Sequence, residues 1–149
     1  MLLNRGDALA LVPVVNGKQP LFVHVERAAD IRMALALRAE FPQLRLVIVG
    51  ASEGWMVAGD LAAAGVPVLA TPLNDLPARF EQLGATQSNV GRMAKAGVKV
   101  SLGAFFDQPR YAPQYAGNLV ALTRVPGATG LSWDQAFAAI SSGPAEAIG

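Results

Sequence analysis

Four short apolar runs, separated by segments of helical pattern, constrain the fold of this chain more than any other feature. The runs cover residues 21–25, 44–49, 67–70 and 98–102. Each is rich in Val, Leu or Ile and lacks polar alternation, which is typical of strands covered on both faces. Their spacing of roughly 20 to 30 residues suits βαβ units. The alternation therefore predicts a parallel α/β sheet.

Helices are expected between the runs, over residues 28–40, 53–64 and 89–96. Ser52 is the expected N-cap of the second helix, and Gly65 its left-handed C-terminal residue. Gly97 closes the third helix in the same way. Two of these junctions nearly repeat each other, residues 61–68 and 93–100, as successive βα units do.

The pattern changes after the fourth run. Residues 107–117 contain two prolines, two tyrosines and two glutamines, which predicts a loop. A short helix is expected over residues 118–124. Ser132 is the expected cap of a further helix over residues 133–140. A Gly143-Pro144 break then precedes the last turn.

Length and composition predict one domain over residues 1–149 with surface that needs a cover. A chain of 149 residues buries a core but is short for a closed eight-stranded barrel, which takes about 250 residues. Only 15% of residues are charged and 52% are apolar. We therefore expect a large apolar patch covered by a second copy or by part of a longer chain.

Charge and hydropathy exclude several partners. The formal charge is +1 and both signs are interspersed, so neither nucleic acid nor an anionic membrane is predicted to bind. No apolar stretch reaches the ~18 residues of a membrane helix, and no signal-peptide core is visible. The chain as given is expected to be cytoplasmic, although a longer parent can be exported. Without cysteine, disulfides, thiolate metal sites and a cysteine nucleophile are excluded.

His24 is the single histidine, and it stands at the end of the first apolar run. Because chemistry gathers at the carboxyl ends of parallel strands, it is a candidate metal ligand or general base. The alternative is a buried imidazole bonded to a backbone carbonyl. Other candidate groups follow the four strands: Glu26, then Ser52 and Glu53, then Thr71 and Asn74, then Asp107. One histidine and a few carboxylates make an all-internal zinc site improbable.

The turn from Gly50 to Gly54 joins a strand to a helix N-terminus, where an anion is favoured. Gly50, Ser52 and Glu53 are the candidate contacts to an anion or substrate there. Glu53 would repel an anion, and the turn matches no phosphate-binding motif. Ordinary helix capping is the favoured interpretation.

An ordered series of segments carries a family resemblance: residues 20–30 (PLFVHVERAAD), 47–55 (VIVGASEGW), 65–68 (GVPV) and 141–149 (SSGPAEAIG). Together they resemble the second half of an amidohydrolase-superfamily protein, of the imidazolonepropionase-like branch. The resemblance implies four parallel βα units that form half of a TIM-type (β/α)8 barrel, strands five to eight. It implies a metal-dependent hydrolase of non-peptide C–N bonds, of cyclic amide or imidazolone type.

The same resemblance assigns roles to particular residues. His24 takes the position of the strand-five metal ligand, and Asp107 that of the catalytic general base. The full-length relatives imply a divalent metal, most often zinc, but their His-x-His pair and bridging ligand lie upstream of Met1. The strand-six ligand is missing near Val49 and Gly50. We therefore expect the chain alone to be inactive, with no tightly bound metal.

Three arrangements follow as alternatives. Two copies of the half-barrel close a ring as a homodimer, or the chain caps a separate subunit, the missing N-terminal half-barrel, in a structural role. The third is a non-catalytic open, doubly wound sheet that binds a small anionic molecule. Strand order separates them, because a half-barrel keeps its strands in sequential order.

Overall fold

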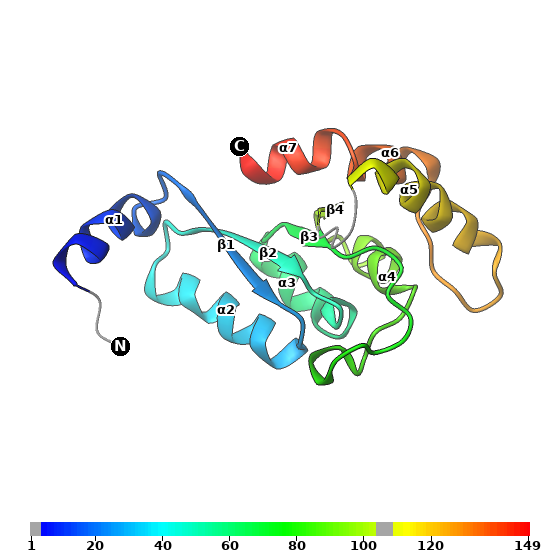
Figure 1. Ribbon diagram of the computed structural model, residues 1–149, viewed down its shortest axis with the longest axis horizontal. Helices are drawn as coiled ribbons and strands as arrows, with labels where there is room; N and C mark the ends of the chain where they lie inside the picture. The colour runs from blue at the N-terminus through cyan, green and yellow to red at the C-terminus, as the bar shows by residue number, and fades with distance from the viewer. Residues whose placement is uncertain (1–3, 104–108) are drawn as a thin grey trace.

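The computed structural model describes residues 4–103 and 109–149, and its centre is a single parallel sheet (Figure 1). The strands are β1 (Pro20–Val25), β2 (Arg45–Gly50), β3 (Val68–Ala70) and β4 (Val100–Leu102). They lie in the order β1-β2-β3-β4 with every neighbouring pair parallel. All four predicted runs are confirmed. The sequential order contradicts the doubly wound alternative, whose strands reverse order at a switch point.

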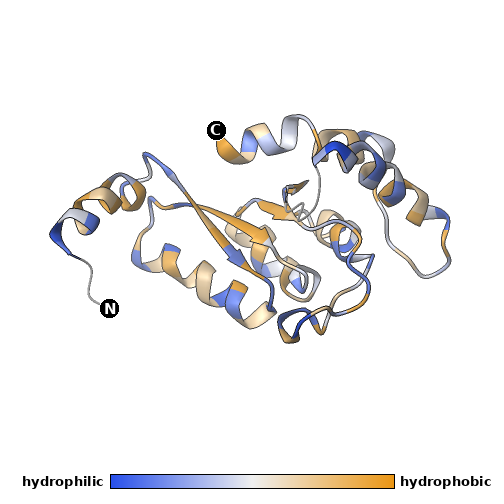
Figure 2. Cartoon of the chain, viewed as in Figure 1, coloured by the Kyte–Doolittle hydropathy of each residue, from blue (hydrophilic) through white to orange (hydrophobic). Residues whose placement is uncertain are grey.

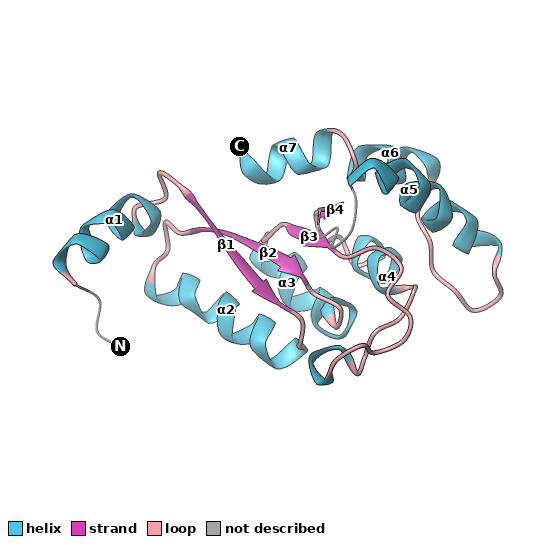
Figure 3. Cartoon of the chain, viewed as in Figure 1, coloured by secondary structure: helices cyan, strands magenta, loops and turns pink. Residues whose placement is uncertain are grey.

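Helices follow and precede the strands (Figure 3). They are α1 (Arg5–Val15), α2 (Ala28–Glu40), α3 (Ala58–Ala64), α4 (Asn89–Lys95), α5 (Ala112–Ala121), α6 (Trp133–Ala139) and α7 (Ser142–Ile148). Short 3-10 segments are η1 (Gly54–Val57), η2 (Phe80–Gln82), η3 (Pro109–Tyr111) and η4 (Leu122–Arg124). The expected helices at 28–40, 89–96 and 133–140 are confirmed. Ser132 caps α6 in a capping box with Gln135, as its position predicted.

Two local expectations are wrong, and one helix was not predicted. Ser52 does not cap α3, because η1 intervenes and the Ser52 hydroxyl accepts a hydrogen bond from Asn74 instead. The predicted loop at 107–117 is helical from Pro109 onward, since a proline in the first turn of α5 needs no N–H partner. The helix that was not predicted is α1, which contains Pro13 and has no buried residue.

Helices α2, α3 and α4 bury one face of the sheet. Side chains from these helices, Ile31, Leu61 and Met93, join strand residues in one buried cluster. The strand members of that cluster are Leu46, Ile48, Val68, Ala70 and Leu102. Since successive side chains alternate across a strand, the residues between them face the other side of the sheet.

That second face carries two rows of side chains set by the strand register. One row runs across all four strands, through His24, Val49, Leu69 and Ser101, and the other pairs Phe22 with Val47. Ser101 and Val47 are buried, whereas Phe22 is 45% exposed. The β1 side of this face is therefore the open side.

Helix α7 covers the β4 side of the second face, and its C-terminal end is hydrogen-bonded to β2. A Cβ added at Gly143 would contact the Ser101 hydroxyl, so the start of α7 lies directly on β4. At its other end, the Ile148 carbonyl accepts a hydrogen bond of 2.7 Å from Arg45 Nη2. Figure 1 shows α7 beside the sheet, on the side opposite α2 and α3.

Apolar surface is exposed at the β1 end of the molecule. Helix α1 projects away from the sheet in Figure 1, and its Leu9, Leu11 and Val12 are at least 42% exposed. Figure 2 shows the strongly apolar strands and the mixed colouring of α1. Within residues 4–103 and 109–149, no helix is long and apolar enough to cross a membrane. The exposed apolar surface expected from composition is present.

Candidate site at the carboxyl ends of the strands

His24 and Glu26 form a fixed pair where β1 ends. His24 Nε2 lies 2.9 Å from Glu26 Oε1, with the His24 side chain 51% exposed and that of Glu26 9% exposed. The other carboxylate oxygen of Glu26 accepts a hydrogen bond of 2.8 Å from the backbone N–H of Ser52. A carboxylate held by two donors cannot rotate freely, so it orients the imidazole. The alternative of a buried histidine on a backbone carbonyl is wrong, because the ring is half-exposed and bonded to a carboxylate.

Gly50 makes room for this pair. Its φ is +91°, a conformation that residues with a Cβ rarely adopt. A Cβ at this position would lie 2.6 Å from Glu26 Oε1 and 2.9 Å from His24 Cδ2. Glycine is thus required both by the backbone and by the close approach of the two side chains.

The N–H groups of the turn after β2 donate hydrogen bonds to acceptors at the end of β1. Ser52 N–H donates to the Glu26 carboxylate, Glu53 N–H donates to the Glu26 carbonyl at 2.9 Å, and Ala51 N–H donates to the Val25 carbonyl at 2.8 Å. An internal carboxylate therefore occupies the position that anion binding, the less favoured interpretation of this turn, would have used. Contact of Gly50, Ser52 and Glu53 with a substrate or anion stays a prediction.

Glu53 connects three segments. Its Oε2 accepts the backbone N–H of Ala28, the first residue of α2, and its Oε1 accepts the backbone N–H of Gly84, each at 3.0 Å. A carboxylate at a helix N-terminus satisfies an orphan donor and complements the helix dipole. Glu53 thus holds α2 and the loop before α4 together, a role that no local sequence signal indicates.

Polar groups from the end of β3 extend the edge. Asn74 Nδ2 donates to the Ser52 hydroxyl at 3.2 Å, which links the loops after β2 and β3. The Thr71 hydroxyl is buried and has no hydrogen-bond partner among the described residues. The expected gathering of the groups that follow strands one to three at one edge is observed for His24, Glu26, Ser52 and Asn74.

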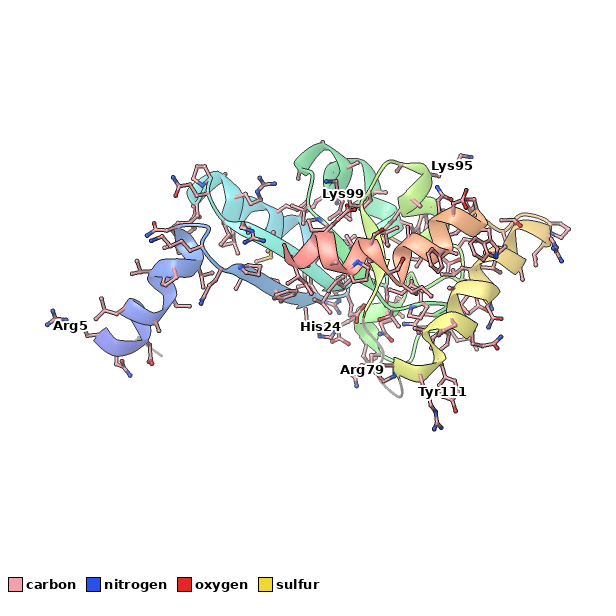
Figure 4. The ribbon with its side chains drawn as sticks, turned by 90° about the horizontal axis from the view of Figure 1, so that it is seen from above. Arg5, His24, Arg79, Lys95, Lys99 and Tyr111 are labelled. Atoms are coloured by element: carbon pink, nitrogen blue, oxygen red, sulfur yellow. The ribbon has the colours of Figure 1, made fainter. Side chains whose placement is uncertain are left out.

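A pocket of about 390 Å³ opens beside the pair. Its lining includes His24 of β1 and Glu26 just after that strand. The other charged and polar side chains that line it are Asp30 of α2, Asn74 and Arg79 of the loop after β3, and Glu81 of η2. Figure 4 shows His24 and Arg79 on the same side of the molecule. The volume lies within the usual range of small-molecule sites, so the pocket accommodates a metabolite-sized ligand.

The described residues do not make up a metal centre by themselves. No group of three or more His, Cys, Asp or Glu side chains with a metal-binding arrangement occurs within residues 4–103 and 109–149. His24 and Glu26 supply one imidazole and one carboxylate that already bond to each other. Asp107, the expected general base, lies outside the described residues. A site with three protein ligands would need groups from elsewhere.

Comparison with solved structures identifies the fold. A crystal structure described as an amidohydrolase from Thermotoga maritima MSB8 superposes with a TM-score of 0.79, at 23% sequence identity. This chain has the fold of part of that amidohydrolase. The alignment covers 99% of this chain and 37% of the Thermotoga chain, so the present chain spans well under half of its neighbour's length. No protein family profile and no curated protein matches the sequence.

The neighbour agrees with the expected architecture. The four parallel βα units in sequential order correspond to a partial (β/α)8 barrel of amidohydrolase type. At this sequence identity the similarity concerns the fold alone. The groups that can do chemistry in this chain are those at the edge where β1, β2 and β3 end.

Proposed function

We propose that this chain contributes part of the active site of a metal-dependent hydrolase of the imidazolonepropionase-like type, which acts on cyclic amide or imidazolone C–N bonds. The observation that carries the proposal is the His24–Glu26–Ser52 chain of hydrogen bonds at the carboxyl edge of a partial amidohydrolase barrel. In this fold, catalytic groups stand at that edge. The 390 Å³ pocket beside the pair supports a small substrate.

Glu26 determines what His24 can offer. An ionised carboxylate can only accept, so in a neutral His24 ring that donates to Glu26 the proton is on Nε2 and Nδ1 is the nitrogen that can ligate a metal. A histidine oriented in this way by a carboxylate is the common arrangement for metal ligands. Glu26 is accordingly proposed as the residue that positions His24, the metal ligand.

The remaining groups are proposed to come from outside the described residues. A divalent metal such as zinc would polarise the substrate carbonyl and activate a water molecule when bound in the completed site. Asp107 is the proposed general base. Because the described residues alone do not hold a metal, the chain by itself is expected to be inactive.

The missing groups are proposed to arrive with a partner that completes the barrel. One edge of β1 and one edge of β4 have no neighbouring strand within the described sheet, and unpaired edges favour pairing with further strands. The exposed Phe22 and the exposed apolar residues of α1 lie at the β1 edge. A second copy of this chain would close the ring but brings only its own single histidine. The missing metal ligands are therefore proposed to come from an N-terminal half-barrel, either as a separate subunit or as part of a longer chain.

Solution mass and metal binding test the proposal together. The expected result for the purified chain is a dimer near twice 15.5 kDa by light scattering, or a monomer that gains mass only with the separate half. The assembly that contains the N-terminal half-barrel, with His24 present, should bind zinc and hydrolyse cyclic amides, and the His24→Ala assembly should lose both. A chain that stays monomeric with every candidate half would refute the completed barrel. Equal activity of His24→Ala would refute the role of His24.

A purely structural half-barrel subunit is the second candidate. It is favoured by the lack of a three-ligand group among residues 4–103 and 109–149. In that case the assembly forms, but His24→Ala leaves metal content and turnover unchanged. The same experiment therefore separates the two candidates.

A further inference from the structure

A second and larger cavity lies at the opposite end of the sheet, where the strands begin. It has a volume of about 570 Å³ and is bounded by the starts of β2, β3 and β4 and by α6 and α7. Arg45 is the first residue of β2, and Lys99 directly precedes β4. Figure 4 shows Lys99 on the far side of the molecule from His24 and Arg79. The cavity is thus separate from the proposed active site and shares no residue with it.

The charged side chains of its lining are mostly cationic. Arg38, Arg45 and Lys99 face a single carboxylate, Glu146, so the formal charge is +2 (three cations and one anion). None of the four forms an ion pair with another described residue. Unpaired positive charge around a partly enclosed cavity favours an anion.

Arg38 holds an unsatisfied donor at this cavity. Its Nη1 donates to the Ala64 carbonyl at the end of α3. Its Nε–H is buried and has no acceptor among the described residues. A buried donor without an acceptor is costly, so Arg38 gains if its guanidinium shifts and brings this N–H to an oxygen of a ligand in the cavity. The planar guanidinium matches the oxygens of a phosphate or carboxylate.

The rest of the lining is part polar, with Gln43, Gln135 and Ser142, and part apolar. Val66, Leu131 and Ala139 belong to the buried core and also border the cavity. A ligand of this size can therefore place an apolar body against α6 while its charged group meets the cations. Several cations around one anionic group suit a dianion better than a monoanion.

We propose that this cavity binds a small organic phosphate monoester, with its phosphate among Arg38, Arg45 and Lys99 and its apolar body toward α6. The proposal goes beyond the hydrolase function and does not depend on it, because none of the residues of the carboxyl edge takes part. It assigns a second ligand site to the amino ends of the strands.

Titration calorimetry with phenyl phosphate on the full chain, in the assembly in which it purifies, tests the site. The expected dissociation constant is about 1 mM or tighter at low ionic strength, weakening as salt is added. Inorganic phosphate and benzoate should bind more weakly, since one lacks the apolar body and the other the second charge. Phenol, the neutral analogue, should bind least.

Matched variants locate the binding. Lys99→Gln should weaken phenyl phosphate binding about tenfold, whereas Lys95→Gln should change it less than twofold. Both lysines are exposed (Figure 4), and of the two only Lys99 lines the cavity. Arg38→Gln should abolish binding, with Arg32→Gln on the same helix as its control. If Arg38→Gln fails to fold because the Ala64 carbonyl loses its donor, the lysine pair decides.

Several results would overturn the site. They are the absence of saturable binding up to about 10 mM phenyl phosphate, equal binding of phenol, or equal weakening by Lys95→Gln and Lys99→Gln. Any of these would leave the cavity as unoccupied space between the strands and α7.

Discussion

Substitution of Gly50 by alanine tests whether the His24–Glu26 pair is rigidly held. Two costs are expected. The φ of +91° costs a residue with a Cβ about 1–2 kcal/mol. In addition, the new Cβ would lie 2.6 Å from Glu26 Oε1, so the carboxylate has to move away.

Moving Glu26 breaks two hydrogen bonds. The carboxylate leaves His24 Nε2 and the Ser52 N–H, and Ser52 is 1% exposed, so its N–H loses its acceptor in a buried place. An unsatisfied buried group of this kind costs about 1–3 kcal/mol. The total expected loss of unfolding free energy for Gly50→Ala is about 2–5 kcal/mol.

Gly97→Ala separates the two costs. Gly97 has a nearly equal φ of +88°, and a Cβ there would meet nothing within 4 Å. Gly97→Ala should therefore lower the unfolding free energy by only about 1–2 kcal/mol. Urea unfolding of both variants at one protein concentration gives the difference, which is the steric and hydrogen-bond cost at Gly50.

A second background isolates Glu26. In Glu26→Ala the carboxylate is gone and the half-exposed ring of His24 can turn aside, so adding Gly50→Ala should cost no more than Gly97→Ala does. Because the chain has one histidine, its ring nitrogen signals in NMR spectra report the tautomer directly. Equal costs for Gly50→Ala and Gly97→Ala, with the ring signals unchanged, would show that Glu26 is not fixed and would refute its positioning role.

Three further substitutions, two of them with a control substitution, test other parts of the fold by urea unfolding. Glu53→Gln leaves one of two backbone N–H groups without its carboxylate acceptor and should lower the unfolding free energy by about 1–3 kcal/mol. The control Glu40→Gln, at an exposed position, should change it by no more than about 0.5 kcal/mol. Equal effects would refute the role of Glu53 in holding α2 to the loop before α4. Gly91→Ala forces a Cβ against a backbone carbonyl and should destabilise the protein by about 1–3 kcal/mol. Gly117→Ala, with open space around the new Cβ, should stabilise it by about 0.5–1 kcal/mol. Changes of the same sign in the two variants would contradict this prediction. Ser132→Ala removes the capping box of α6 and should cost about 1 kcal/mol, and no measurable loss would contradict that cap.

The sequence predicted what depends on local pattern. The apolar runs, helix α2 and the Ser132 cap follow from residue order alone, because periodicity and capping act over a few residues. The position of His24 at a strand end followed in the same way. The strand order was expected only through the family resemblance.

What the sequence did not predict depends on partners far along the chain. Glu53 bonds to Ala28 and Gly84, which are 25 and 31 residues away, so its position directly after Ser52 suggested a cap or a ligand contact instead. The Ser52 hydroxyl likewise meets Asn74, 22 residues on. Pro109 and Pro113 suggested a loop, although a proline at the start of a helix is well accommodated.

The contacts of α7 have a consequence for the order of folding. The bond between Arg45 and Ile148 joins residues 103 positions apart, and α7 also lies on Ser101 of the last strand. Such distant pairing is slow, because the intervening chain must be ordered before the contact can form. Docking of α7 should therefore be a late step, and the amino ends of β2 and β4 should be the last part of the sheet to gain protection from hydrogen exchange.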